Sequence, residues 1–372
     1  MEVHDFGQLG LIVLESCREL GMKVDYFIKT MRENSGDEVD SYMVPIQEIR
    51  FNNGEGKIKL KDTVRGKDIY ILCDVGNYSC TYTMFGYITH KGPDEHFQDI
   101  KRVVSAIAGK ARRVTVITPL LYGSRQHKRN GRESLDCAMG LQELERLGVS
   151  SIITFDAHDP TVQNAIPLIS FENIYPTYTM LKNFILEEKE LIIDRNHTLV
   201  ISPDTGAMGR AIYYSNVLGL DVGMFYKRRD HLTVVNGKNP IIQHEYIGTD
   251  VKDKTVLIID DMIASGESVL DIAYEVKKRG ANKVFVGATF AFFTEGLAKF
   301  NQYYEDGMIT KVYATNLSYL SEEVKAQAWF KEVDMSKFIA KIITTLNHDQ
   351  SISPLLDATE KIRRLMGSRK QG

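Results

Sequence analysis

The residues best suited to chemistry in this chain lie between Val256 and Gly280. Two adjacent carboxylates, Asp260 and Asp261, follow four apolar residues, and the stretch 264–268 reads Ala-Ser-Gly-Glu-Ser. Paired carboxylates at the carboxyl end of a buried strand can accept hydrogen bonds from vicinal sugar hydroxyls or help to hold a divalent cation. Small residues, hydroxyls and backbone N–H groups at a helix N-terminus can hold a phosphate dianion. Together these groups describe a site for a sugar phosphate.

The flanking residues predict the elements that would position this site. Val256 to Ile259 form an apolar run without polar alternation, which is typical of a strand buried on both faces of a parallel sheet. Val269 to Val276 carry apolar residues at helical spacing, and Gly280 is a suitable C-cap. The simpler alternative is an ordinary turn whose acids only favour the positive end of the helix.

Two clusters of cations also follow predicted buried strands. The strand 114–119 leads into a basic loop at 120–133, and Val222 to Tyr226 lead into Lys-Arg-Arg at 227–229. Arg gives planar bidentate contacts to phosphate and Lys a mobile point charge, so both clusters could bind a polyphosphate. A solvated basic surface is the alternative for each.

Two further strand ends carry possible metal or phosphate ligands. The strand 151–155 is followed by Asp156, Ala157, His158 and Asp159, and the strand 199–201 leads to Asp204. A single His is more often structural than a ligand, and Asp204 could serve as a helix N-cap.

These segments resemble the ribose-phosphate diphosphokinase (PRPP synthetase) family of the phosphoribosyltransferase superfamily. Residues 259–268 resemble its PRPP-binding loop, and the other matching segments are Phe-Asn-Asn-Gly-Glu at 51–55, the loop 122–133, Asp-Ala-His at 156–158, Ser-Pro-Asp at 202–204 and Lys-Arg-Arg at 227–229. The similarity covers most of residues 44–356, with the motifs in the order found in the family. The chain departs from the family at Asn53, His127, Ala157, Asp159 and Ala264, and in the order of the basic residues at Lys128-Arg129.

The resemblance implies a role for each matching residue. Lys227 and Arg229 would be catalytic, and His158 and Asp204 would position Mg²⁺. The ATP-binding residues would be Phe51, Asn53, Gly54, Glu55, Arg125, Gln126 and His158. The residues that bind ribose 5-phosphate would be Arg229, Asp260, Asp261, Ala264, Ser265, Gly266, Glu267 and Ser268.

Strands alternating with helices predict an α/β fold with two doubly wound domains, each built on a parallel sheet. The resemblance indicates the type I phosphoribosyltransferase-like version of this fold. We expect an ATP-side domain at 1–172, a ribose 5-phosphate-binding domain at 173–356 and a basic extension at 357–372.

The reaction implied is transfer of the diphosphoryl group of MgATP to the 1-hydroxyl of ribose 5-phosphate, giving PRPP and AMP for nucleotide biosynthesis. The sequence has no Walker A motif, so ATP would be bound in another way. Two alternatives remain open: a non-catalytic PRPP synthetase-like regulatory subunit, and a phosphoribosyltransferase that consumes PRPP.

The composition limits the partners. A net charge of -3 argues against a general nucleic-acid binder, and no apolar stretch has the length of a membrane span. The four cysteines lack metal-ligand spacing and are typical of reduced thiols, which favours a cytoplasmic protein. The resemblance implies a homo-oligomer, commonly a hexamer.

The remaining expectations concern local structure. The apolar spacing from Leu9 to Leu20 predicts a short helix, and Lys57 to Leu60 predicts a hairpin strand. We expect a loop at 74–96, where the family resemblance is weak, a final helix at 334–346 and a surface insertion at 33–40.

Overall fold

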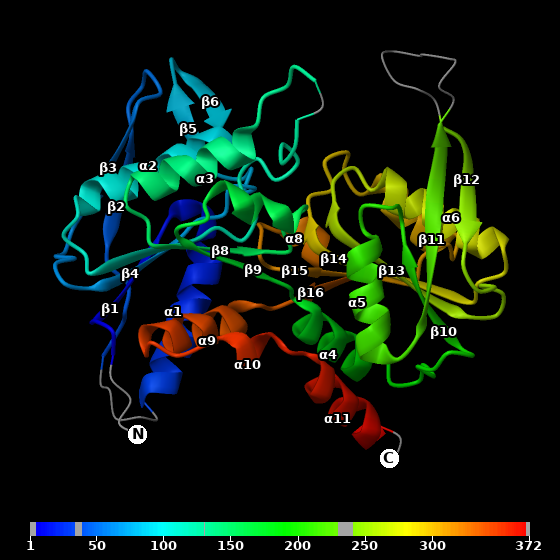
Figure 1. Ribbon diagram of the computed structural model, residues 1–372. Coiled ribbons are helices and arrows are strands. Elements are labelled where there is room, and N and C mark those ends of the chain that lie inside the picture. Colours follow the sequence, from blue (N-terminus) through cyan, green and yellow to red (C-terminus); the bar gives the residue numbers. More distant parts are fainter. Residues whose placement is uncertain (1–4, 34–38, 130, 230–240, 370–372) are drawn as a thin grey trace. The chain divides into compact units, whose positions relative to one another are not determined.

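The computed structural model describes residues 5–33, 39–129, 131–229 and 241–369, with only the backbone described at 227–229, 241–244 and 368–369 (Figure 1). The chain forms two compact units. Unit 1 comprises Met1–Pro176, Asn316–Tyr319 and Asp334–Leu356, and unit 2 comprises Thr177–Thr315, Leu320–Val333 and Asp357–Gly372. The mixed α/β architecture with parallel sheets is the predicted fold class.

Unit 1 contains a five-stranded parallel sheet in the order β1-β4-β7-β8-β9. Its strands are β1 (Leu9–Val13), β4 (Asp68–Leu72), β7 (Arg113–Ile117), β8 (Ser151–Phe155) and β9 (Ser170–Ile174). Its helices are α1 (Arg18–Glu33), α2 (Pro93–Ile107), α3 (Asp136–Arg146), α9 (Ser336–Asn347) and α10 (Ser353–Leu356), with short 3₁₀ turns at Glu15–Cys17 and Pro160–Ala165. Helices α2 and α3 cover one face of the sheet, and α1 and α9 cover the other (Figure 1).

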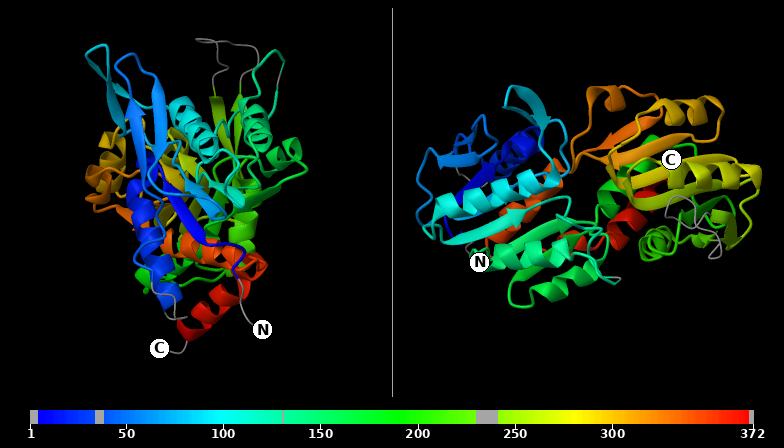
Figure 2. Two further views of the ribbon diagram at one scale, coloured as in Figure 1. Left: turned by 90° about the vertical axis from the view of Figure 1, so that its left-hand side faces the viewer. Right: turned by 90° about the horizontal axis from the view of Figure 1, so that it is seen from above.

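Two antiparallel hairpins extend from unit 1 and lie side by side (Figure 2). One consists of β2 (Ile46–Arg50) and β3 (Gly56–Leu60), which confirms the predicted hairpin strand. The other consists of β5 (Thr81–Met84) and β6 (Tyr87–His90), within the stretch predicted to be a loop. The Phe85 N–H donates to the Asn52 carbonyl over 2.8 Å, so the turns of the two hairpins are joined.

The segment 334–356 belongs to unit 1, although the sequence analysis places it in the C-terminal domain. The reason is a buried polar cluster around Asp68, which is 0% exposed. Asn347 of α9 donates to Asp68 over 2.9 Å, and Arg113 donates to the same carboxylate and to the Leu346 carbonyl. A buried carboxylate needs such partners, so α9 is held on this sheet. The segment 357–372 belongs to unit 2.

Unit 2 contains a seven-stranded sheet in the order β12-β11-β10-β13-β14-β15-β16. Its strands are β10 (Thr198–Ser202), β11 (Asp221–Arg229), β12 (Ile241–Ile247), β13 (Thr255–Ile263), β14 (Lys283–Ala291), β15 (Lys311–Thr315) and β16 (Phe330–Val333). Its helices are α4 (Thr177–Glu187), α5 (Met208–Leu218), α6 (Glu267–Lys278), α7 (Ala298–Glu305), α8 (Glu322–Lys325) and α11 (Thr359–Arg369). All neighbouring strands are parallel except the pair β11 and β12.

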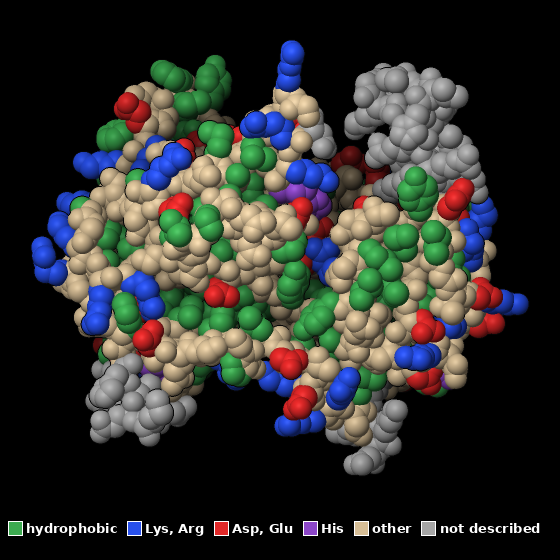
Figure 3. All heavy atoms as spheres, in the orientation of Figure 1, with side chains coloured by type: hydrophobic (Ala, Val, Ile, Leu, Met, Phe, Trp, Pro, Cys, Tyr) green, Lys and Arg blue, Asp and Glu red, His purple; other side chains and the backbone are tan. Residues whose placement is uncertain are grey.

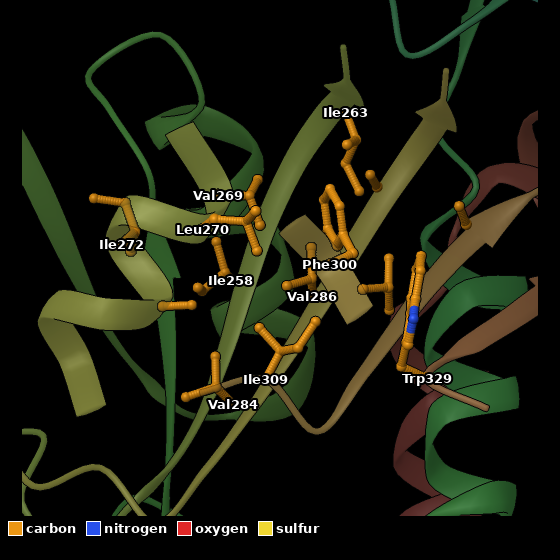
Figure 4. Packing of buried hydrophobic residues seen from close by; sticks show 14 of the residues in the cluster. Ile258, Ile263, Val269, Leu270, Ile272, Val284, Val286, Phe300, Ile309 and Trp329 are labelled. Carbon is orange, nitrogen blue, oxygen red and sulfur yellow. The ribbon is translucent and has the colours of Figure 1, made fainter. Parts of the chain in front are cut away.

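The core of unit 2 lies between this sheet and helices α6 and α7. Ile258 of β13 and Val286 of β14 face Leu270 of α6 in a close-packed cluster (Figure 4). Phe300 of α7 is fully buried, and its ring stacks on Trp329 with a centroid separation of 5.2 Å. The core therefore continues from the middle of the sheet to the first turn of α6.

The prediction of a helix over Leu9–Leu20 is wrong. Residues 9–13 form strand β1, all of them buried and paired in parallel with β4, and the helix α1 begins only at Arg18. Gly21 lies inside this helix instead of ending it. A Cβ at Gly21 would lie 2.4 Å from Val13 Cγ1, so the glycine lets α1 pack closely on β1.

Two functional strands are longer than predicted. Strand β13 runs to Ile263, so Asp260 and Asp261 lie within the strand and not after it, because β14 continues to pair with it as far as Ile263 and Ala291. Strand β11 runs to Arg229, so the three cations at 227–229 lie within the strand and not after it as predicted. Its last residues pair with the antiparallel strand β12, which extends them as a ribbon.

The helices that the structure describes include none long and apolar enough to cross a membrane.

We predict that Phe300→Ala lowers the free energy of unfolding by about 3–5 kcal/mol, because it leaves a cavity beside Trp329. Denaturant unfolding followed by fluorescence is a suitable measurement, since Trp329 is the single tryptophan of the chain. Tyr304→Ala, on the same helix but 39% exposed, should change the midpoint little. Equal effects of the two substitutions would contradict this account of the core.

Candidate functional site

The strand order of unit 2 reverses direction between β10 and β13. Strand β11, which follows β10 in sequence, lies on one side of it, and β13 lies on the other. In open α/β sheets, ligands bind outside the carboxyl ends of the strands at such a switch point. Asp204 follows β10 and Asp260 lies near the end of β13, and these strands pair from Thr198↔Thr255 to Ile201↔Ile258. The sheet therefore brings these two predicted site residues to the same edge.

Asp260 and Asp261 form a tight pair of carboxylates in β13. The Asp261 N–H donates to Asp260 Oδ1 over 2.9 Å, and the Met262 N–H donates to Asp261 Oδ1 over 2.9 Å. Burial, followed by the nearby Asp261 carboxylate, raises the pKa of Asp260 well above its usual range, while the Arg210 guanidinium acts in the opposite direction. The pair is thus placed where its ionised form lacks solvation, and a hydroxyl or cationic ligand would supply what is missing.

The loop 264–268 is held on the core at the start of α6. Gly266 has a φ of +91°, and a Cβ there would lie 2.3 Å from Phe300 Cε2, so this position requires glycine both for its backbone and for its space. The Thr294 N–H donates to the Ala264 carbonyl over 2.9 Å and fixes the beginning of the loop. Helix α6 begins at Glu267, so the loop lies at the positive end of a twelve-residue helix.

Asp204 organises the turn between β10 and α5. Its Oδ1 accepts hydrogen bonds from the N–H groups of Gly206 at 2.8 Å and Ala207 at 3.0 Å. The N-cap of α5 is Ala207, so Asp204 closes the turn before the helix instead of capping it, and these bonds occupy one of its two carboxylate oxygens. Within the part of the chain that the structure describes, these two bonds leave Asp204 Oδ2 available to a ligand.

Lys227 and Arg229, the two predicted catalytic cations, have only their backbone among the described atoms. That backbone continues β11, whose neighbour is β10, with Ser202 opposite Met224. Their positions thus lie beyond the carboxyl end of β10, next to the Asp204 turn. Their side chains lie outside the described residues.

In unit 1, the cationic loop follows β7. Gly123 has a φ of +63°, and a Cβ there would lie 2.9 Å from the Cys137 backbone nitrogen. The Gln126 N–H donates to the Gly123 carbonyl, and Tyr122 stacks on Phe97 with a centroid separation of 4.2 Å. The base of the loop is thus anchored on α2 and α3, and Arg125 and Gln126 follow directly. Figure 3 shows Lys and Arg side chains (blue) beside His side chains (purple) on this part of the surface.

His158 follows the neighbouring strand β8. The backbone bends at Asp156, a buried residue with a φ of +47°, a conformation that costs energy for a residue other than glycine. The bend is held by hydrogen bonds from the Asp156 N–H to the Ile174 carbonyl and from the Ala157 N–H to Asn173 Oδ1. It brings His158 to the surface, with its ring centroid 5.3 Å from that of His127.

The Phe51–Glu55 segment forms the turn of the β2–β3 hairpin. Asn53 bridges it, since its Oδ1 accepts from the Glu55 N–H and its Nδ2 donates to Glu55 Oε2. Phe51 is 47% exposed, and Phe85 in the adjoining turn is 74% exposed. The apolar side chains of these turns project at the top left of Figure 3.

The structure thus places the predicted residues in two sets and one outlying turn. Asp204, Asp260, Asp261 and the loop 264–268 share one edge of the unit 2 sheet, with the backbone of Lys227 and Arg229 beside them. Arg125, Gln126 and His158 share one edge of the unit 1 sheet. The Phe51–Glu55 turn lies on a separate hairpin.

Two residues near these edges escaped the sequence analysis. Arg210 is the third residue of α5, which begins at Met208, and its charge acts on Asp260. Asp74 follows β4, where it accepts hydrogen bonds from Ser318 and from the Tyr319 N–H, and burial raises its pKa to about 6. An acid directly after a buried strand was the available signal for Asp74, whereas nothing in the spacing of Arg210 distinguished it.

The described part of the chain contains no group of three or more His, Cys, Asp or Glu side chains placed to hold a metal ion. This pattern is compatible with Mg²⁺, which usually keeps several waters and binds through one or two protein groups together with substrate phosphates.

We predict that Asp260→Asn stabilises the protein at neutral pH. Because the folded-state pKa of Asp260 is raised, the folded protein keeps this proton at a pH where the unfolded chain has lost it, so stability falls as pH rises above the usual carboxyl range. Asn cannot ionise, so its free energy of unfolding lacks this dependence on pH. The difference in free energy of unfolding between variant and wild type should therefore grow by up to about 1.4 kcal/mol per pH unit between the unfolded-state and folded-state pKa values of Asp260. Unfolding curves at several pH values measure it, with the exposed Glu305→Gln as the control. A constant gap across pH would refute the prediction.

We predict that Gly266→Ala weakens binding of ribose 5-phosphate by at least about tenfold, because the clash with Phe300 must displace the loop. Gly307→Ala is the matched control, since Gly307 also has a positive φ of +68° but has nothing within 4 Å of its Cβ position. Calorimetric titration with ribose 5-phosphate measures the effect. Equal affinity of both variants for ribose 5-phosphate would show that the loop 264–268 does not bind this ligand.

The chain is similar to known proteins both in sequence and in fold. The family model described as the N-terminal domain of ribose phosphate pyrophosphokinase matches residues 9–148, and that of the phosphoribosyl transferase domain matches residues 172–310. Ribose-phosphate pyrophosphokinases of Haemophilus ducreyi and Vibrio cholerae are 27% and 26% identical to this chain, over 83% of its length and 90% of theirs. The crystal structure of phosphoribosylpyrophosphate synthetase from Mycobacterium smegmatis aligns with a TM-score of 0.73 at 20% identity, covering 92% of this chain and 99% of that one, and supports the fold. The chain belongs to the ribose-phosphate pyrophosphokinase family.

Proposed function

We propose that this protein is an enzyme that transfers the diphosphoryl group of MgATP to the 1-hydroxyl of ribose 5-phosphate, giving PRPP and AMP for nucleotide biosynthesis. The observation that carries the proposal is the meeting of Asp204, Asp260 and the α6 loop at the switch point of unit 2, in a chain of this family. A sugar phosphate matches this combination, since it presents vicinal hydroxyls and a dianion to a pair of carboxylates and a helix N-terminus.

In the acceptor half of the reaction, the loop from Ala264 to Ser268 binds the 5-phosphate. Its backbone N–H groups lie at the positive end of α6, and the loss of the acid at Ala264 leaves those donors intact. Asp260 and Asp261 accept hydrogen bonds from the ribose hydroxyls. The acceptor is thereby oriented with its 1-hydroxyl free to react.

In the donor half, Arg125, Gln126 and His158 bind the ATP phosphates, and the turn from Phe51 to Glu55 binds the base. Mg²⁺ bound with ATP would neutralise charge on its phosphates, and the family resemblance implies His158 and Asp204 as its protein contacts. Unit 1 then serves the nucleotide and unit 2 serves the ribose.

The transfer forms a bond from the 1-hydroxyl oxygen to the β-phosphorus and breaks the bond from that phosphorus to the oxygen that leaves with AMP. The hydroxyl loses its proton. Lys227 and Arg229 stabilise the charge that develops on the transferred group.

We also propose that the protein works as a homo-oligomer, with a hexamer as the expected form. The exposed Phe51 turn supports this, because a base-binding turn on a projecting hairpin can reach a neighbouring copy. A cytoplasmic location is supported by the four cysteines, all of them free and buried.

The direct test is to incubate the purified protein with ribose 5-phosphate, MgATP and inorganic phosphate, and to follow AMP. We expect AMP and PRPP in equal amounts. Binding of both ligands without AMP would favour a regulatory subunit, and consumption of PRPP in the presence of a free base would favour a phosphoribosyltransferase.

We predict that Lys227→Ala lowers turnover by about two to four orders of magnitude, the effect of losing a preorganised charge contact of roughly 3–5 kcal/mol. Binding of ribose 5-phosphate should persist, since its phosphate is held by the loop 264–268. AMP formation and calorimetry measure the two properties. Unchanged turnover would remove Lys227 from the catalytic machinery.

A further inference from the structure

Two residues in different loops of unit 1, His127 and Asp159, contact one another. His127 lies in the cationic loop after β7, and Asp159 lies beyond the end of β8. His127 Nε2 is 3.5 Å from Asp159 Oδ2, although the two residues are 32 positions apart in the sequence. The contact therefore joins the two loops that carry Arg125 and His158.

The Asp159 carboxylate is oriented by its own turn. Its Oδ1 accepts hydrogen bonds from the Thr161 N–H at 2.9 Å and from the Thr161 hydroxyl at 2.7 Å. These bonds fix Asp159 at the start of the 3₁₀ turn Pro160–Ala165 and leave Oδ2 directed at His127. The hydrogen bonds from Thr161, and then the nearby His127 and Lys128, lower the pKa of Asp159.

His127 is fixed from three sides. Its Nδ1 lies 3.2 Å from the Ser124 carbonyl oxygen, its Nε2 faces Asp159, and its ring lies 5.3 Å from the ring of His158 at an angle of 56°. The His127 side chain is only 11% exposed, while Asp159 is 31% exposed. An imidazole with both nitrogens facing acceptors and one edge beside His158 is restricted in both position and rotation.

We propose that His127 and Asp159 form a positioning pair that holds the cationic loop against the His158 loop and so sets the distance between Arg125 and His158 for a nucleotide polyphosphate. The inference rests on the proposed function, because it assigns ATP to these two loops. His127 acts through Gln126 and Arg125, which lie one and two residues before it, and through the ring of His158. Neither member of the pair needs to touch the reacting atoms.

The geometry explains why the pair acts together. A histidine alone in the loop would have no acceptor at Nε2, and an acid alone beside His158 would add negative charge where ATP brings its phosphates. With both residues present, the Asp159 carboxylate faces His127, and the cationic loop balances its negative charge. Each departure from the family is thus compensated by the other.

A double-mutant cycle on MgATP affinity tests the pair. Asp159→Asn keeps an oxygen for the Thr161 bonds and removes the carboxylate from His127, and His127→Ala removes the ring. We expect each single variant to raise the Kd of MgATP, and the KM for ATP, by about tenfold, the size of one charge-assisted contact. The double variant should be no weaker than either single variant, since both remove the same contact.

Three controls separate positioning from general destabilisation. His127→Gln, which can still donate to Asp159, should recover most of the affinity. The Kd of ribose 5-phosphate should stay unchanged in all variants. The matched pair His197 and Asp194 forms another His-Asp contact of 2.8 Å, which is exposed in unit 2, and His197→Ala or Asp194→Asn should leave MgATP affinity unchanged.

The outcomes distinguish this inference from the proposed function. Additive losses in the double variant, or a Kd of MgATP unaffected by both single variants, would overturn the pair. A wild-type protein that binds MgATP but forms no AMP would overturn the catalytic proposal alone, and the cycle on Kd would still decide the pair. A wild-type protein that fails to bind MgATP would overturn both.

Discussion

The burial of two adjacent carboxylates at the end of a central strand is the constraint on which unit 2 depends. Strand β13 carries Asp260 and Asp261 past the apolar run, because β14 pairs with it along its whole length. Ionised acids in such a place are poorly solvated, so the fold carries a destabilising feature that a ligand can relieve. The surroundings contribute partial compensation through backbone N–H groups and the charge of Arg210. A sugar with vicinal hydroxyls would complete it.

The hydrophobic core and the ligand loop are parts of one structure. Phe300 stacks on Trp329 in the core and also fills the space beside Gly266. The glycine accepts the ring because it has no Cβ, and its positive φ turns the chain into α6. The position of the loop is therefore fixed by the same packing that stabilises the sheet, and the backbone donors are preorganised before any ligand arrives.

Much of the fold and of the site follows from local patterns in the sequence. Apolar runs without alternation predict strands β7, β8 and β10 to within two residues at each end, because a parallel strand must be apolar on both faces. The acids, cations and His that follow such runs predict the site edges, since the ends of parallel strands share one side of the sheet. Helical spacing gives the wrong element at Leu9–Val13. Five consecutive buried residues fit both the helical and the strand period, and pairing with β4 makes this segment a strand. Long-range contacts, such as Asn347 with Asp68, leave no local signal at all.

Departures from a family pattern are best interpreted in three dimensions. By the family resemblance, His127 stands in place of an acid in the cationic loop, and Asp159 adds an acid beside His158. Their contact links the two changes, because Thr161 donates to one oxygen of the Asp159 carboxylate and leaves the other oxygen facing His127. The charges at this edge of the unit 1 sheet are then balanced by His127 and Asp159 together, and not by either residue alone. Ala264 has no such compensating partner. The acid that it replaces would have been a side chain, however, and the binding groups of this loop are backbone N–H groups at the start of α6.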